Sequence, residues 1–144
     1  VLAYDKYLSN YTDEYAIEAS LEQIQQEANI LSIHVPLSTE TKGYYNYQFF
    51  NGFKHSLYLI NTSRGEVLPL ADLTKLLKDG KLLGAALDVL PNEQFTKLSE
   101  KEREELMNLL AQSNVLLSPH VAGWTKESYR KISEVLFEKI ITFF

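Results

Sequence analysis

The chain has 144 residues, a length that suits one globular domain. Its formal net charge of -5 argues against nucleic acid as a main partner, because phosphate binding requires clustered lysine and arginine. The absence of cysteine excludes disulfides and thiolate chemistry and fits a reducing cytoplasm, and no apolar run is long enough to span a membrane.

The first elements predicted along the chain are a strand, a helix and a second strand. Residues 1–4 form a short apolar run that stops at Asp5. Ser20 has the side chain of a helix N-cap, with a capping-box partner three residues later. Residues 30–35 form a β-branched run that ends at Pro36, which cannot donate to a strand ladder.

The middle of the chain continues this alternation. Residues 47–53 predict a short helical turn, and residues 57–61 predict a buried strand. A helix is expected over residues 69–78, because proline suits its first turn and Gly80 suits its stop. Residues 82–89 predict a further strand that contains several small side chains.

The last third is expected to hold a long loop, two helices and a strand. The loop covers residues 91–99, and Ser99 with Glu102 forms a capping box at the start of the next helix. Residues 115–117 predict the last strand, and Thr125 caps a final helix with an apolar stripe.

Apolar strands that alternate with amphipathic helices predict an α/β fold, in which helices cover both faces of a parallel sheet. Open sheets of this kind bind ligands beyond the carboxyl ends of their strands. Candidate site residues are therefore the polar side chains that follow each predicted strand. They are Asp5, His34, residues 61–65, Asp88, Glu93 and residues 118–120.

Two of these residues carry charges that suit an anionic or sugar-bearing ligand. The Asp5 carboxylate can accept hydrogen bonds from ribose hydroxyls and would repel a 2′-phosphate, although a solvated turn is the plain alternative. The Arg64 guanidinium can bind a substrate carboxylate in a fork and polarise a neighbouring keto oxygen. The alternative for Arg64 is an ordinary surface ion pair.

His120 is the candidate proton donor, because imidazole exchanges protons near neutral pH. A carboxylate at its second nitrogen would favour the charged ring, and Glu93 is the candidate for that contact. Taken singly, His120 could be an ordinary loop or capping histidine, and Glu93 could be an ordinary surface acid. The three histidines have no paired helical spacing, so no metal site is expected.

The ordered set of these segments resembles the NAD-dependent D-isomer-specific 2-hydroxyacid dehydrogenases. Glu93 follows Asp88, and Arg64 precedes it, at the spacings that the family uses. The matching stretches are residues 1–5 (VLAYD), 33–41 (IHVPLSTET), 59–65 (LINTSRG), 84–89 (GAALDV) and 117–123 (LSPHVAG).

The resemblance implies a Rossmann-type sheet with NAD as its cofactor. Asp5 would hold the adenosine ribose, and Val35 and Pro36 would line the adenine side of the cofactor site. Backbone at residues 62–63, with the Asp88 carboxylate, would hold the nicotinamide amide. The full set of implied cofactor contacts is Asp5, Val35, Pro36, Thr62, Ser63, Arg64, Asp88, His120, Val121, Ala122 and Gly123.

The resemblance also implies three catalytic residues. Arg64 would bind the carboxylate and keto oxygen of the substrate. His120 would give its proton to that oxygen during reduction and take the proton back during oxidation. Glu93 would orient His120 and keep it protonated.

One feature departs from the family pattern: no two glycines are spaced as Gly-x-Gly. The family's first strand and glycine-rich turn would precede Val1, so residues 1–144 are expected to be a partial NAD-binding domain that is inactive alone. For the full-length protein we expect a homodimeric enzyme of the 3-phosphoglycerate dehydrogenase type. The alternative is a non-catalytic, NAD(H)-binding, redox-sensing relative similar to a co-repressor.

Overall fold

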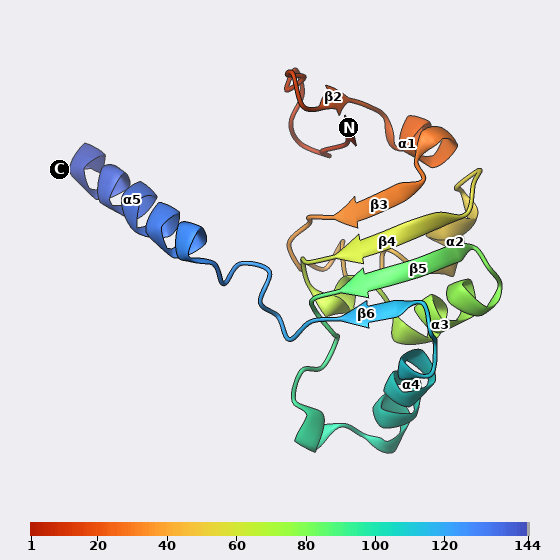
Figure 1. Cartoon of the computed structure of the whole chain (residues 1–144). Coiled ribbons are helices and arrows are strands. Elements are labelled where there is room, and N and C mark those ends of the chain that lie inside the picture. Colours follow the sequence, from red (N-terminus) through yellow and green to blue (C-terminus); the bar gives the residue numbers. More distant parts are fainter. Residues whose placement is uncertain (144) are drawn as a thin grey trace.

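A computed structural model describes residues 1–143 of the chain (Figure 1). All of its strands pair in parallel, in two separate sheets. The two-stranded sheet pairs β1 (Leu2–Ala3) with β2 (Ile17–Glu18). The four-stranded sheet has the order β3 (Ile30–Ile33), β4 (Leu57–Asn61), β5 (Leu82–Leu87) and β6 (Val115–Leu117).

Two helix starts and one helix end illustrate the capping chemistry. Ser20 Oγ accepts the first bond of α1 from the backbone of Gln23, and Ser99 with Glu102 forms a complete capping box on α4. Gly80, with a φ of +71°, takes up the left-handed conformation that ends α3. The helices are α1 (Leu21–Glu27), α2 (Tyr47–Asn51), α3 (Leu70–Lys78), α4 (Glu100–Leu110) and α5 (Lys126–Phe143), with 3₁₀ turns η1 (Gly65–Val67) and η2 (Phe95–Lys97).

The core lies between one face of the four-stranded sheet and its helices. Phe50 of α2, Leu73 of α3 and Leu109 of α4 join one buried cluster with Leu59 of β4 and Leu87 of β5. The helices α2, α3 and α4 lie together beside the sheet (Figure 1). This arrangement confirms the predicted parallel α/β fold.

The second face of the four-stranded sheet differs from the expectation of helices on both faces. Within residues 1–143 its side chains Ile30, Tyr58 and Leu116 are 61%, 52% and 74% exposed. The apolar stripe of α5 could cover such a face, but no described residue of this helix is buried. In Figure 1, α5 instead runs away from the sheet.

Strand pairing explains where two strands stop short of their predicted ends. Asn61 is the last residue of β4, and it pairs with Ile33 of β3 and Leu87 of β5. Beyond that point neither neighbour has a partner strand, so β3 ends before residue 35 and β5 before residue 89.

None of the described helices combines the length and apolarity that crossing a membrane requires.

Candidate active site

The polar turns predicted to carry chemistry follow neighbouring parallel strands. Arg64 comes after β4, Asp88 and Glu93 come after β5, and His120 comes after β6. Because parallel strands point the same way, their carboxyl ends share one edge of the sheet, which is where ligands bind in open α/β folds.

Glu93 and His120 are in direct contact at this edge. His120 Nδ1 lies 3.0 Å from each of the two Glu93 carboxylate oxygens, across 27 residues of chain. Both side chains are almost half exposed, at 45% and 44%. The His120 backbone has a φ of +55°, a conformation that is uncommon for residues other than glycine and is often found at functional sites. The pair therefore presents an oriented imidazole to solvent.

The backbone around His120 is held by Asp88, whose carboxylate is buried. Asp88 accepts hydrogen bonds from Ser118 Oγ at 2.5 Å and from the backbone N–H groups of Val121 and Ala122, each at 2.9 Å. Burial raises the pKa of Asp88, but these three hydrogen bonds and the nearby His120 outweigh it, so the pKa lies below its usual value. Asp88 is thus ionised and clamps the turn on both sides of His120.

Asn61 shapes the turn that carries Arg64. Its side chain is almost completely buried; it donates to Arg64 O at 3.1 Å and accepts from the backbone and hydroxyl of Ser63 at 3.0 and 2.8 Å. The Arg64 guanidinium itself donates to Ser63 O at 2.6 Å. The position of this turn is therefore set from inside the sheet.

Gly65 lets the Arg64 turn approach the loop that leads to Glu93. A Cβ atom at this position would lie 2.0 Å from the carbonyl carbon of Leu90 and 2.3 Å from Pro91 N. Only a residue without a side chain fits against that backbone. The two segments that carry Arg64 and Glu93 are consequently in contact.

A cavity of about 510 Å³ opens beside the Arg64 turn, between the ends of β3 and β4. It combines an apolar wall with polar groups, which is the usual character of a small-molecule site. Its lining residues are His34, Val35, Pro36, Leu37, Thr62, Ser63 and Arg64. Five of the predicted contact residues thus share one cavity, whereas Glu93 and His120 do not line it.

Asp5 is placed apart from that cavity. Its Oδ1 accepts hydrogen bonds from the backbone of Tyr7 and Leu8 at 2.7 and 3.0 Å, so the residue forms the kind of turn considered as its alternative role. The following Lys6 pairs with Glu40, which ties this segment to the chain that follows β3. The ribose contact stays a prediction.

Two contributors to the site, Asn61 and Ser118, were among the candidate positions but were not assigned a role from the sequence. Asn61 ends β4 and Ser118 follows β6, and a polar residue that closes an apolar strand was the signal available for both. Across residues 1–143 no cluster of three or more histidine, cysteine or acidic side chains could hold a metal ion.

Comparison with known proteins identifies the family. A family model described as "D-isomer specific 2-hydroxyacid dehydrogenase, NAD binding domain" matches residues 1–122. A D-lactate dehydrogenase from Staphylococcus aureus is 31% identical over 139 residues, which cover 93% of this chain and 42% of the relative. A putative D-3-phosphoglycerate dehydrogenase from Schizosaccharomyces pombe is 36% identical over 118 residues, 79% of this chain and 25% of the relative.

Solved structures agree with this assignment. A D-isomer specific 2-hydroxyacid dehydrogenase from Lactobacillus delbrueckii ssp. bulgaricus, in its NAD complexed form, superposes with a TM-score of 0.79 at 31% identity. The superposition covers 99% of this chain and 45% of that chain. The chain thus spans less than half the length of these relatives. By sequence and by structure, it belongs to the NAD-binding domain family of the D-isomer specific 2-hydroxyacid dehydrogenases.

Proposed function

We propose that this chain supplies the proton-transferring and carboxylate-binding residues of an NAD-dependent D-2-hydroxyacid dehydrogenase. The contact between Glu93 and His120 carries the proposal, because an acid–imidazole pair is the machinery that such a reaction needs. The activity is proposed for the whole enzyme, since the chain spans less than half of its relatives.

The residues around the 510 Å³ cavity fit part of a dinucleotide. Val35 and Pro36 offer an apolar wall, and Thr62 and Ser63 bring hydroxyl and backbone hydrogen-bonding groups. No glycine pair in the sequence has the Gly-x-Gly spacing that cradles a diphosphate, so residues 1–144 supply no such loop. We therefore assign these residues to the apolar and amide-bearing parts of the cofactor, whose reduced form, NADH, would supply the hydride.

Arg64 and His120 have separate tasks in the proposed reduction of a 2-keto acid. The Arg64 guanidinium binds the substrate carboxylate and polarises the keto oxygen. Since Glu93 occupies Nδ1 of His120, Nε2 is the ring nitrogen that can face the substrate. His120 gives its Nε2 proton to the keto oxygen while the carbon receives hydride, and the product is a 2-hydroxy acid.

Asp88 supports this proton transfer by holding the backbone that follows His120. With the turn clamped and Glu93 at Nδ1, the imidazole cannot swing freely between orientations. A fixed ring lowers the entropic cost of reaching the reactive geometry, which is the general benefit of a positioned acid. Both acids therefore act on the same histidine, one through its ring and one through its backbone.

The substrate is proposed to be a small 2-keto or 2-hydroxy acid. A D-lactate dehydrogenase and a putative D-3-phosphoglycerate dehydrogenase are both relatives of similar identity, so the phosphoglycerate assignment stays a prediction. A homodimer and a cytoplasmic location are proposed with it.

Oxidation of NADH by the whole enzyme tests the proposal with a panel of 2-keto acids, some of them phosphorylated. We expect turnover with at least one acid, and Arg64→Gln should raise the KM and lower kcat because both the carboxylate and the keto oxygen lose their partner. A protein that quenches NADH fluorescence but reduces none of the panel would be a redox-sensing relative instead, and the enzyme proposal would be rejected.

A further inference from the structure

The loop that carries Glu93 is long, and it is packed at its start but exposed over residues 93–97. It connects β5 to α4 over residues 88–99, and the Glu93 side chain near its middle is 44% exposed. A cavity of about 350 Å³ separates the start of this loop from the helices beneath it. Side-chain packing alone therefore does not fix where Glu93 lies.

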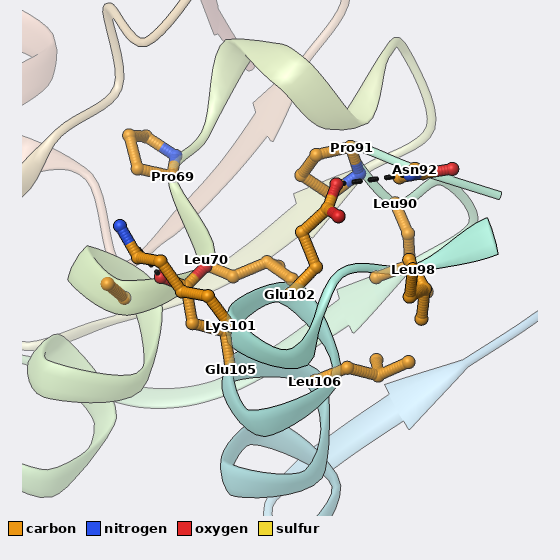
Figure 2. Close-up of a pocket in the computed structure, with 11 residues that line it drawn as sticks. Pro69, Leu70, Leu90, Pro91, Asn92, Leu98, Lys101, Glu102, Glu105 and Leu106 are labelled. Atoms are coloured by element: carbon orange, nitrogen blue, oxygen red, sulfur yellow. Dashed lines mark hydrogen bonds and ion pairs between the residues drawn. The ribbon is translucent and has the colours of Figure 1, made fainter. Parts of the chain in front are cut away.

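Asn92, the residue before Glu93, links the loop to a helix. Its Nδ2 donates to Glu102 Oε1 at 3.0 Å, and its Oδ1 accepts from the backbone of Gln94 at 3.0 Å. One amide thus anchors the loop to α4 and also closes a turn around Glu93. Figure 2 shows the bond between Asn92 and Glu102 at the rim of the cavity.

Glu102 is itself fixed by the capping box of α4. Its Oε2 accepts from the Ser99 backbone at 2.8 Å and from the Ser99 hydroxyl at 2.6 Å. The side-chain bonds from Ser99 and Asn92, followed by the Ser99 backbone bond, lower the pKa of Glu102 to about 2. Glu102 is thus a charged acceptor at neutral pH, in the first turn of a regular helix.

We infer that Asn92 and Glu102 are positioning residues that set Glu93 against His120, through the bond from Asn92 Nδ2 to Glu102 Oε1. The chain of contacts runs from α4 to Glu102, to Asn92, to its neighbour Glu93 and then to the imidazole. This inference rests on the proposed function for its catalytic consequence. The geometric consequence, where the proton sits on His120, can be measured without activity.

The informative variant is Asn92→Asp. The new carboxylate still accepts from Gln94 but cannot donate to Glu102, and it faces a like charge. In the whole enzyme we expect kcat to fall roughly 10- to 100-fold, since small misplacements of catalytic groups have effects of that size. The KM for the keto acid should change less, because Arg64 lies on a different turn. Asn92→Ala serves as a second variant without the added charge.

Two control variants separate positioning from helix stability. Ser99→Ala removes the capping hydroxyl but keeps the Ser99 backbone bond and the Asn92 bond to Glu102. It should lower the unfolding free energy and reduce kcat far less than Asn92→Asp, because two of the bonds to Glu102 remain. Glu104→Gln removes one negative charge from the exposed side of α4. It should alter neither the unfolding free energy nor kcat.

The readout that needs no activity is ¹⁵N NMR of the histidine side chains. In the unaltered chain, neutral His120 should keep its proton on Nδ1, facing Glu93, and in Asn92→Asp part of the population should move the proton to Nε2. An unchanged tautomer in Asn92→Asp, or a Ser99→Ala enzyme as impaired in kcat as Asn92→Asp, would overturn the inference. An enzyme that reduces no keto acid would reject the proposed function, while the tautomer comparison would still decide the role of Asn92.

Discussion

Replacing Gly65 with alanine tests how closely the Arg64 turn and the Glu93 loop are packed. The added Cβ would meet Leu90 C at 2.0 Å, Leu90 O at 2.3 Å and Pro91 N at 2.3 Å. Non-bonded carbon atoms normally rest about 3.5–4.0 Å apart, so the backbones must separate by roughly 1.5 Å. All three atoms belong to the main chain, and no change of rotamer can relieve the overlap.

The expected cost follows from that overlap. Forcing extra atoms into a packed site costs about 1–3 kcal/mol, and a clash with backbone belongs at the upper end. We therefore expect Gly65→Ala to lower the unfolding free energy by about 3 kcal/mol. For a chain of this size, that loss corresponds to a fall in Tm of roughly 6–12 °C.

Urea and thermal unfolding followed by circular dichroism measure this loss. Gly123→Ala is the matched stability control, because a Cβ there has no neighbour within 4 Å and should change stability by less than about 0.5 kcal/mol. If Gly65→Ala is as stable as Gly123→Ala, the close approach of the two segments does not exist in solution.

Four further outcomes follow from the same contacts. In the whole enzyme, Glu93→Gln should lower kcat for reduction, because a neutral amide holds His120 Nδ1 less firmly than the carboxylate does; an unchanged kcat would remove Glu93 from the mechanism. Asp88→Asn puts an amide nitrogen among hydrogen-bond donors and should lower the unfolding free energy by about 1–3 kcal/mol in urea titrations; no loss would show that the clamp around His120 is weak. Since the folded pKa of Glu102 is about 2 and its ordinary value is 4.5, its stabilising effect is complete above pH 4.5 and is lost as the pH falls towards 2; Glu102→Gln should flatten that acid limb of the pH–stability curve, and an unaltered limb would contradict the role of the capping box. Thr74 Oγ1 is buried without a hydrogen-bond partner among residues 1–143, so Thr74→Val should be neutral or stabilising by up to about 1 kcal/mol, and a clear loss of stability would point to a bound water at the hydroxyl.

The elements that the sequence predicted well have strong local signals. The strand over residues 57–61 is flanked by polar turns and is present with the predicted ends, as is the strand over residues 115–117. The capping box of Ser99 and Glu102 is complete because both of its partners lie within one helical turn. Local chemistry was sufficient in each case.

The elements that were missed or mis-sized depend on distant partners. The strand β2 (Ile17–Glu18) has only two residues, both exposed, so it shows no hydrophobic alternation. The ends of β3 and β5 follow from the last residue of β4, which lies elsewhere in the sequence. The apolar stripe of α5 predicted a buried face, but burial also requires a surface to pack against, and a periodicity does not specify one.

The site shows the same division. Arg64, Glu93 and His120 could be selected because each follows a predicted strand, and the resemblance supplied their roles. The bond from Asn92 to Glu102 could not be predicted, since it joins a loop to a helix ten residues away and the sequence pattern indicated only a capping role for Glu102. The contact of Asp88 with the nicotinamide amide stays a prediction, whereas its bonds to Ser118 and to the backbone after His120 join separate turns and could not be predicted.

The central claim is that His120 donates the proton in the reduction of a 2-keto acid. The most direct measurement is kcat for NADH oxidation by the whole enzyme carrying His120→Gln, with NADH binding followed by fluorescence in the same samples. We predict a loss in kcat of roughly 10²- to 10⁴-fold, the usual contribution of a positioned acid, with a Kd for NADH within a few-fold of that of the unaltered enzyme. A His120→Gln enzyme that reduces the keto acid at the original rate would contradict the account.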